Sequence, residues 1–101
     1  MKRTLIALAA VAALGASANS IAGDVAAGKA RAMSCAGCHG AAGISAVPIY
    51  PNLAGQKAAY TKKQLKAFKD GSRKDPTMNA MSKPLSDADM DNIAAFYESL
   101  K

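Results

Sequence analysis

The stretch Cys35-Ala36-Gly37-Cys38-His39 decides how this chain folds. Two thiols three positions apart, followed at once by a histidine, have the spacing used for covalent haem attachment. The thiols can add to the two vinyl groups along one edge of a porphyrin. The histidine is then held beneath the ring, where its imidazole can ligate iron. The stretch therefore predicts one haem c, covalently attached through Cys35 and Cys38.

Three other kinds of site could use these residues: a structural zinc site, a thioredoxin-like redox pair and a disulfide. A structural zinc site needs four protein ligands, whereas the whole chain has two cysteines and one histidine. A thioredoxin-like pair follows a strand in a βαβ unit, but the flanks here are Ala-rich and helical. A disulfide between Cys35 and Cys38 stays open in an oxidising compartment, although it gives His39 no role. Haem attachment uses all three side chains.

The N-terminal segment 1–22 has the pattern of a secretory signal peptide. Met1-Lys2-Arg3 supplies the basic start and residues 5–14 the short apolar centre, with small residues at the cut. The apolar run is far shorter than the ~20 residues that a membrane-spanning helix needs, which favours cleavage over a retained anchor. Cleavage fits after Ala18 and after Ala22, and we favour Ala22. The leader predicts export to the periplasm of a Gram-negative-type bacterium, without stable membrane insertion after cleavage.

The remaining segment, residues 23–101, is predicted to be a single domain of 79 residues with few large side chains: no Trp, two Phe and three Tyr. So small a core needs an additional stabilising element, and a covalently held porphyrin would supply the missing apolar volume. The formal charge of +6 includes Lys2 and Arg3, which leaves +4 on the mature domain. Basic residues cluster in residues 57–74, a pattern that indicates mostly a solvated helix face, and so mild a positive balance argues against nucleic acid as a partner.

In the first half of the domain, one helix and one long loop are predicted. The helix covers residues 25–34, with Asp24 at its N-cap. Gly28 costs about 1 kcal/mol against Ala inside a helix, so we expect it to permit a close crossing with another helix. Residues 40–55 lack periodicity and contain several glycines and prolines. Such a long loop is acceptable in a small domain when it wraps a cofactor.

Two helices and a second loop are predicted in the rest of the domain, so the fold class is all-α. The first helix covers residues 56–70 and ends at Gly71, and residues 72–84 are expected to be a loop. The last helix runs from Ser86 to the C-terminus, opened by a capping box between Ser86 and Asp89. The side chains expected to face inward are Tyr60 or Thr61, Leu65, Phe68, Met90, Ile93, Ala94, Tyr97 and Leu100.

Taken together, residues 23–101 resemble class I cytochrome c of the small bacterial single-haem type, and one half of the bacterial two-haem cytochromes. That resemblance implies an all-α fold of three or four helices and loops wrapped around one covalently attached haem. It rests on Asp24-Val25-Ala26-Ala27-Gly28-Lys29, Cys35-Ala36-Gly37-Cys38-His39-Gly40, Tyr50-Pro51-Asn52-Leu53-Ala54-Gly55-Gln56, Tyr60, Gln64-Leu65, Phe68, Gly71, Arg73, Met78, Met81, Leu85-Ser86-Asp87 and Ile93-Ala94-Ala95-Phe96-Tyr97.

The resemblance also assigns residues to roles. His39 would be the proximal iron ligand, and Pro51 would accept the other imidazole N–H through its backbone carbonyl, which fixes the ring. Leu53 would pack on the porphyrin. Gly28 would meet Phe96 where the first and last helices cross.

Four methionines in the domain are candidates for the second iron ligand. Met33 and Met90 are expected to be core residues, the usual fate of methionine. Met78 and Met81 fall in the predicted loop, where a side chain can be aimed at a ligand site. The family's spacing to the last helix suits Met78 better, and Met81 is kept as the alternative. The predicted metal ligands are therefore His39 and Met78.

Haem iron ligated on both sides has no position for a substrate, which predicts an electron-transfer protein and not an enzyme. The iron would cycle between ferrous and ferric states, with unidentified redox proteins as donor and acceptor. Two alternatives stay open. The chain could be the haem subunit of a periplasmic dehydrogenase or oxidase complex, or a five-coordinate haem protein that binds small ligands.

Overall fold

A computed structural model describes residues 23–101, and the predicted signal peptide of residues 1–22 lies outside the described residues. These residues form α-helices and one short 3₁₀ segment, with no strand among them, which confirms the all-α prediction. None of the helices in this range combines the length and apolarity needed to cross a membrane. In chain order the elements are α2 (Val25–Arg31), η2 (Ala32–Cys35), α3 (Ala36–His39), α4 (Ala58–Asp70), α5 (Pro76–Ser82) and α6 (Asp87–Ser99).

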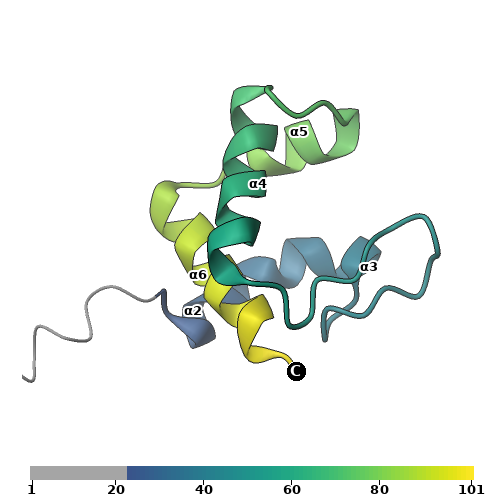
Figure 1. The fold of residues 1–101 in the computed structure, drawn as a ribbon, viewed down its shortest axis with the longest axis vertical. Helices are drawn as coiled ribbons and strands as arrows, with labels where there is room; N and C mark the ends of the chain where they lie inside the picture. Colours follow the sequence, from purple (N-terminus) through teal and green to yellow (C-terminus); the bar gives the residue numbers. More distant parts are fainter. Residues whose placement is uncertain (1–22) are drawn as a thin grey trace, which may run out of the picture.

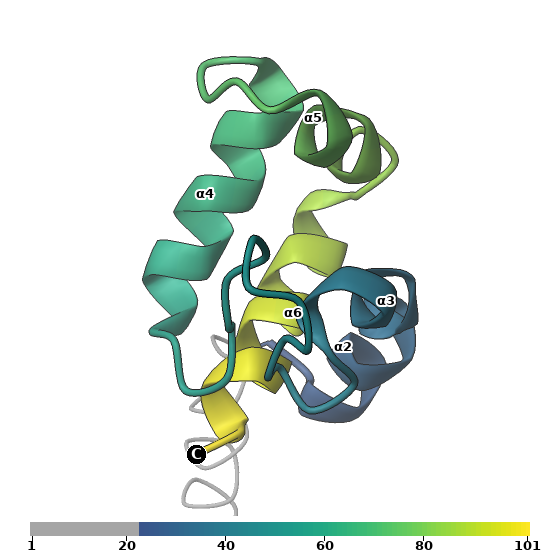
Figure 2. The same cartoon turned by 90° about the vertical axis from the view of Figure 1, so that its right-hand side faces the viewer.

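The C-terminal helix α6 is the centre of the fold. It packs against α2 on one side and against α4 on the other, and α5 packs against α4. Figure 1 shows α4 upright, α5 beside its C-terminal end, and the loop after α3 extending to the right. After a quarter turn, α6 is seen between α4 and α2, with that loop in front of it (Figure 2). The attachment stretch (residues 35–39) and α5 are thus far apart in the sequence, yet both contribute residues that pack against the core.

The crossing of α2 and α6 requires Gly28, as predicted. A Cβ atom at this position would lie 1.9 Å from the backbone oxygen of Asn92 and 2.9 Å from Cβ of Phe96. Only a residue without a side chain permits the two helix backbones to approach so closely. A hydrogen bond from the backbone N–H of Asp24 to Oδ1 of Asn92, at 2.8 Å, ties the start of α2 to α6 at the same crossing.

The predicted helix boundaries at Gly71 and Ser86 are present in the structure. Gly71 ends α4 in the left-handed conformation, with φ of 84°. Ser86 opens α6 through a complete capping box: its hydroxyl accepts from the N–H of Asp89, and the Asp89 carboxylate accepts from the N–H of Ser86. The expected loop 40–55 is also irregular, and α4 begins shortly after it, at Ala58.

The expectation that residues 72–84 form a loop is wrong, because α5 occupies Pro76–Ser82. Asp75 is its N-cap, and its carboxylate accepts from the N–H of Met78. Pro76 occupies the first helical position, where a missing N–H costs nothing and the fixed φ suits the helix. Met78 and Met81 are therefore carried by a short helix and not by a loop.

The core is built from α6 and the faces turned toward it. Of the two residues predicted as alternatives at the start of α4, Thr61 is buried and Tyr60 is half exposed. The main apolar cluster consists of Ala32, Leu65, Leu85, Met90, Ile93, Phe96 and Tyr97, and the partly buried Cys35, Leu53, Met78 and Leu100 pack against it.

Candidate haem-binding site

The attachment stretch folds as one continuous helical segment, η2 followed by α3. Cys35 ends η2 and Cys38 lies within α3; both are half-buried and unpaired, so they form no disulfide with each other. His39 is the last residue of α3 and is buried, with 7% of its surface exposed. The three side chains named by the sequence therefore lie in a single turn of structure, partly protected from water.

The ring of His39 is fixed by Pro51, which is the contact that the sequence resemblance implied. Nδ1 of His39 lies 2.9 Å from the backbone oxygen of Pro51. A carbonyl oxygen can only accept, so Nδ1 carries the proton and the lone pair of the neutral imidazole lies on Nε2. A histidine held in this way presents Nε2 to a metal, and the carbonyl contact increases its basicity.

Pro51 and Leu53 are placed by hydrogen bonds that fold the long loop onto the domain. The N–H groups of Leu53 and Ala54 donate to the backbone oxygen of Gly43, at 2.8 and 3.0 Å. The N–H of Gly55 donates to the backbone oxygen of Tyr97 at 2.8 Å, which anchors the end of the loop to α6. The loop therefore has a defined path past His39, and Leu53 packs on the apolar cluster.

Met78 reaches the same cluster from the opposite end of the domain. It is half-buried and packs against the cluster, as Cys35 and Leu53 do. Three residues assigned to haem contact by the sequence therefore converge, although they come from η2, the loop and α5. Met81, one turn further along α5, is 40% exposed. The two candidate ligands differ in burial although they are on the same helix.

The structure separates the other two methionines. Met90 is 3% exposed and lies in the core, as predicted. The expectation that Met33 is a core residue is wrong, since it is 76% exposed. Its neighbour Ala32 is the residue that faces the core, and consecutive residues of a helical segment point about 100–120° apart. Burial of Ala32 therefore turns Met33 toward solvent.

A buried tyrosine lies beside the attachment stretch and was recognised from the sequence only as a core residue. Tyr97 of α6 is 1% exposed. Burial raises the pKa of Tyr97 above its ordinary value, and the nearby Cys35 sulfur adds to this shift. The phenol is thus held neutral in the core, next to one of the two attachment positions.

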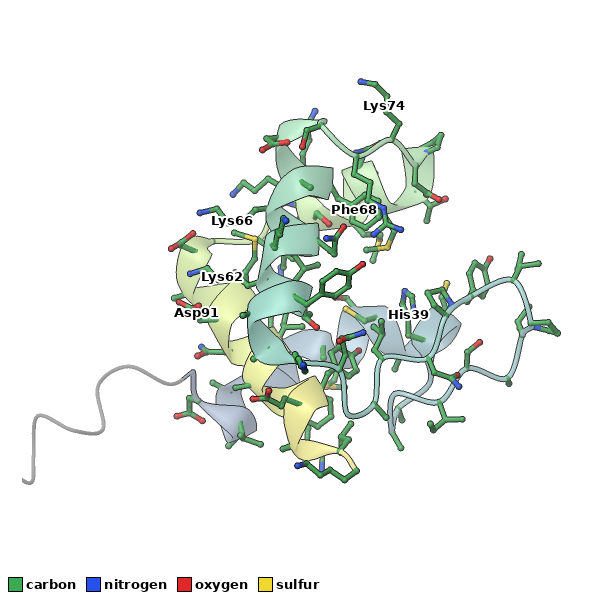
Figure 3. All side chains as sticks on the ribbon, in the orientation of Figure 1. His39, Lys62, Lys66, Phe68, Lys74 and Asp91 are labelled. Carbon is green, nitrogen blue, oxygen red and sulfur yellow. The ribbon has the colours of Figure 1, made fainter. Side chains whose placement is uncertain are left out.

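The basic segment 57–74 is partly neutralised within the fold. Lys62 lies 2.8 Å from Asp91 and 3.4 Å from Asp87, and Lys66 lies 3.6 Å from Asp87. The contact with Asp91 raises the pKa of Lys62, and the contact with Lys62 lowers the pKa of Asp87. Figure 3 shows Lys62, Lys66 and Asp91 on the side of α4 away from His39.

The described domain is similar to known proteins in both sequence and structure. Residues 25–101 match the cytochrome c family. Over 81 residues the chain is 47% identical to cytochrome c-554(548) of Halomonas halodenitrificans, covering 77% of this chain and 98% of that protein. The crystal structure of reduced recombinant cytochrome c4 from Pseudomonas stutzeri superposes with a TM-score of 0.75 at 43% identity, over 79% of this chain and 47% of that one. The thiosulfate dehydrogenase electron acceptor of Thiomonas intermedia is 41% identical over 102 residues, covering 100% of this chain and 45% of that protein.

These findings define the class of protein: the chain belongs to the cytochrome c family. It is similar to the whole of a small bacterial cytochrome and spans about half the length of cytochrome c4 and of the thiosulfate dehydrogenase electron acceptor. Membership of this family implies electron transfer and a covalently attached haem c, and Cys35 and Cys38 have the attachment spacing. Cys35, Cys38 and His39 fit haem c, because they offer two free thiols and an imidazole whose Nδ1 is already hydrogen-bonded, which leaves Nε2 for iron.

Proposed function

We propose that the chain is an electron-transfer protein of the periplasm whose haem c cycles between ferrous and ferric states. The hydrogen bond between His39 and Pro51 is the observation that carries this proposal, because it leaves Nε2 of His39 for iron. When bound, the haem supplies the one-electron redox chemistry. The chain's own residues would hold it covalently through Cys35 and Cys38 and orient the proximal imidazole, and Leu53, which packs against the core cluster, would pack on it.

The second axial ligand in this proposal is Met78. Its side chain packs against the cluster that Cys35 and Leu53 also contact, whereas Met81 is 40% exposed. A thioether is a soft ligand that favours ferrous iron and raises the reduction potential. With His39 and Met78 both on iron, no position remains for a substrate, which supports a carrier and not an enzyme.

The test compares Met78→Ala with Met81→Ala, two matched truncations on the same helix, in the purified holoprotein. Met78→Ala should abolish the weak ferric charge-transfer band that thioether ligation produces, lower the reduction potential and admit external ligands such as imidazole. Met81→Ala should largely preserve all three properties. The reverse pattern would transfer the ligand role to Met81. Rapid carbon monoxide binding by the ferrous wild-type protein would instead support a five-coordinate, ligand-binding haem.

Location in the periplasm is supported by the signal-peptide pattern of residues 1–22. Haem attachment and export can be checked together on protein isolated from a cell fraction. Its intact mass should equal residues 23–101 plus one haem, and a pyridine haemochrome spectrum should report c-type attachment. A mass that retains the leader would contradict cleavage after Ala22.

A second candidate is supported by the similarity to the thiosulfate dehydrogenase electron acceptor of Thiomonas intermedia. In this version the chain accepts electrons as the haem subunit or dedicated partner of a dehydrogenase. The two versions differ in assembly: a free shuttle elutes alone from a sizing column, whereas a subunit co-purifies with its dehydrogenase at moderate salt. Tagged protein purified from its own host distinguishes them.

A further inference from the structure

The side chain of Asn79 makes an unusual set of contacts for a residue on a short surface helix. Its Nδ2 donates to the backbone oxygen of Phe68 at 2.7 Å and to that of Arg73 at 2.9 Å. Its Oδ1 accepts from the backbone N–H of Asp75 at 2.9 Å. All three partners are main-chain groups, so one half-buried amide uses both its donors and its acceptor on the backbone. We call these three hydrogen bonds the Asn79 clamp.

The clamp joins three pieces of chain: the end of α4, the turn that follows it and the start of α5. Phe68 lies in the last turn of α4, where backbone oxygens have no partner within the helix. Arg73 belongs to the connecting turn, and Asp75 is the N-cap of α5. The amide therefore fastens the beginning of α5 to the end of α4 and to the turn between them.

The position of α5 depends on such anchors. The helix has seven residues, and isolated helices of this length are not stable in water. Met78 precedes Asn79 directly, and it is half-buried against the core cluster. One residue thus points at the core while the next fixes the helix to α4. Any movement of α5 away from α4 moves the Met78 side chain with it.

We propose that Asn79 is a positioning residue for the axial ligand Met78, and that the clamp keeps the thioether available to iron in the ferric state. This inference rests on the proposed ligand role of Met78. Soft sulfur binds ferric iron less firmly than ferrous iron, so the ferric protein depends more on how the thioether is held. An external ligand binds only when the thioether has left, and its apparent affinity is set by the population of that open state.

The test is an optical titration of ferric holoprotein with imidazole. Asn79→Ala should bind imidazole about tenfold more tightly than wild type, a change equivalent to about 1.4 kcal/mol. It should also show a weaker ferric charge-transfer band. Asn79→Ser keeps a short donor and should lie between the two, which provides a milder variant should the Ala protein fold poorly. Asn79→Asp places a carboxylate against two carbonyl oxygens and should be at least as impaired as Asn79→Ala.

Asn92→Ala is the matched control. Asn92 is also a half-buried amide bonded to a backbone group, the N–H of Asp24, but it lies at the crossing of α2 and α6. This variant should lower the unfolding midpoint and leave imidazole affinity and the ferric band unchanged. A positioning role predicts that the Asn79 and Asn92 variants differ in ligand exchange even where their losses of stability are similar.

Two results overturn the inference without touching the proposed function. Either Asn79→Ala and Asn79→Ser keep wild-type imidazole affinity and lose only stability, or Asn92→Ala raises imidazole affinity as much as Asn79→Ala does. Failure of the proposed ligand has a different signature, because Met78→Ala would then retain the ferric band. In that case the positioning role of Asn79 is refuted together with the ligand assignment.

Discussion

Replacing Gly28 by alanine tests whether the close approach of α2 and α6 holds the domain together. The added Cβ would lie 1.9 Å from the backbone oxygen of Asn92 and 2.9 Å from Cβ of Phe96. Non-bonded carbon atoms are comfortable at roughly 3.5–4.0 Å, so α2 must move away from α6 by about 1 Å or more. The obstructing oxygen belongs to the backbone of α6 and cannot rotate out of the way.

The size of the effect follows from opposing contributions. Overpacking a tight contact typically costs about 1–3 kcal/mol, and the separation also strains the hydrogen bond from Asp24 to Asn92, worth about 1 kcal/mol. Alanine returns about 1 kcal/mol through its higher helix propensity. We therefore expect Gly28→Ala to lower the free energy of unfolding by about 1–3 kcal/mol. In a domain of this size the melting temperature should fall by roughly 5–25 °C.

The assay is urea unfolding of the holoprotein, followed by far-ultraviolet circular dichroism and by haem absorbance. Ala30→Gly calibrates the propensity contribution, because Ala30 is exposed on the same helix. It should cost about 1 kcal/mol without any steric component. If Gly28→Ala were as stable as wild type, or more stable, the propensity gain would exceed the clash and the close crossing would not be a requirement of this fold.

Two further predictions concern α6. Ser86→Ala removes the hydroxyl that accepts from the N–H of Asp89 at 3.0 Å and should lower the free energy of unfolding in urea by about 1 kcal/mol. Ser86→Asp should keep most of that stability, because serine and aspartate are both good N-caps. An equal loss in both variants would contradict the capping role. Burial raises the pKa of Tyr97 in the folded state, so its contribution to stability is complete below about pH 10 and declines above it by up to ~1.4 kcal/mol per pH unit. Tyr97→Phe should remove this decline in the ferrous protein. The burial that raises the pKa of Tyr97 persists once Cys35 is a thioether. If the free energy of unfolding of wild type and variant fell in parallel at alkaline pH, this prediction would be wrong.

The elements that could be predicted from sequence are those with local signals. Gly28 interrupts an otherwise good helix, Gly71 follows an amphipathic one, and Ser86 with Asp89 forms a capping box within four residues. Each signal involves neighbours in the chain, so no knowledge of the tertiary structure was needed. The attachment stretch is local in the same sense, since Cys35, Cys38 and His39 share one helical segment.

Helix α5 was missed although its start carried a signal. Asp75 followed by Pro76 is a good N-cap and first position, but a seven-residue helix is too short to show a convincing apolar period. Its stability comes from elsewhere, notably from the amide of Asn79 on the backbone of Phe68, eleven positions earlier. The sequence does not reveal that contact, because the acceptor is a backbone oxygen, which every residue has.

The basic segment 57–74 shows why the tertiary structure is needed to judge how positive a surface is. The sequence places many positive charges on one helix, but the carboxylates that neutralise Lys62 and Lys66 are on α6, at Asp87 and Asp91. Lys62, Lys66 and Asp91 lie on the side of α4 away from His39 (Figure 3), and the ion pairs fasten α4 to α6. Surface pairs of this kind contribute modestly to stability and are screened by salt. A count of lysines therefore overstates the net positive charge of this segment, because part of it is neutralised by carboxylates of α6 that only the tertiary structure brings near.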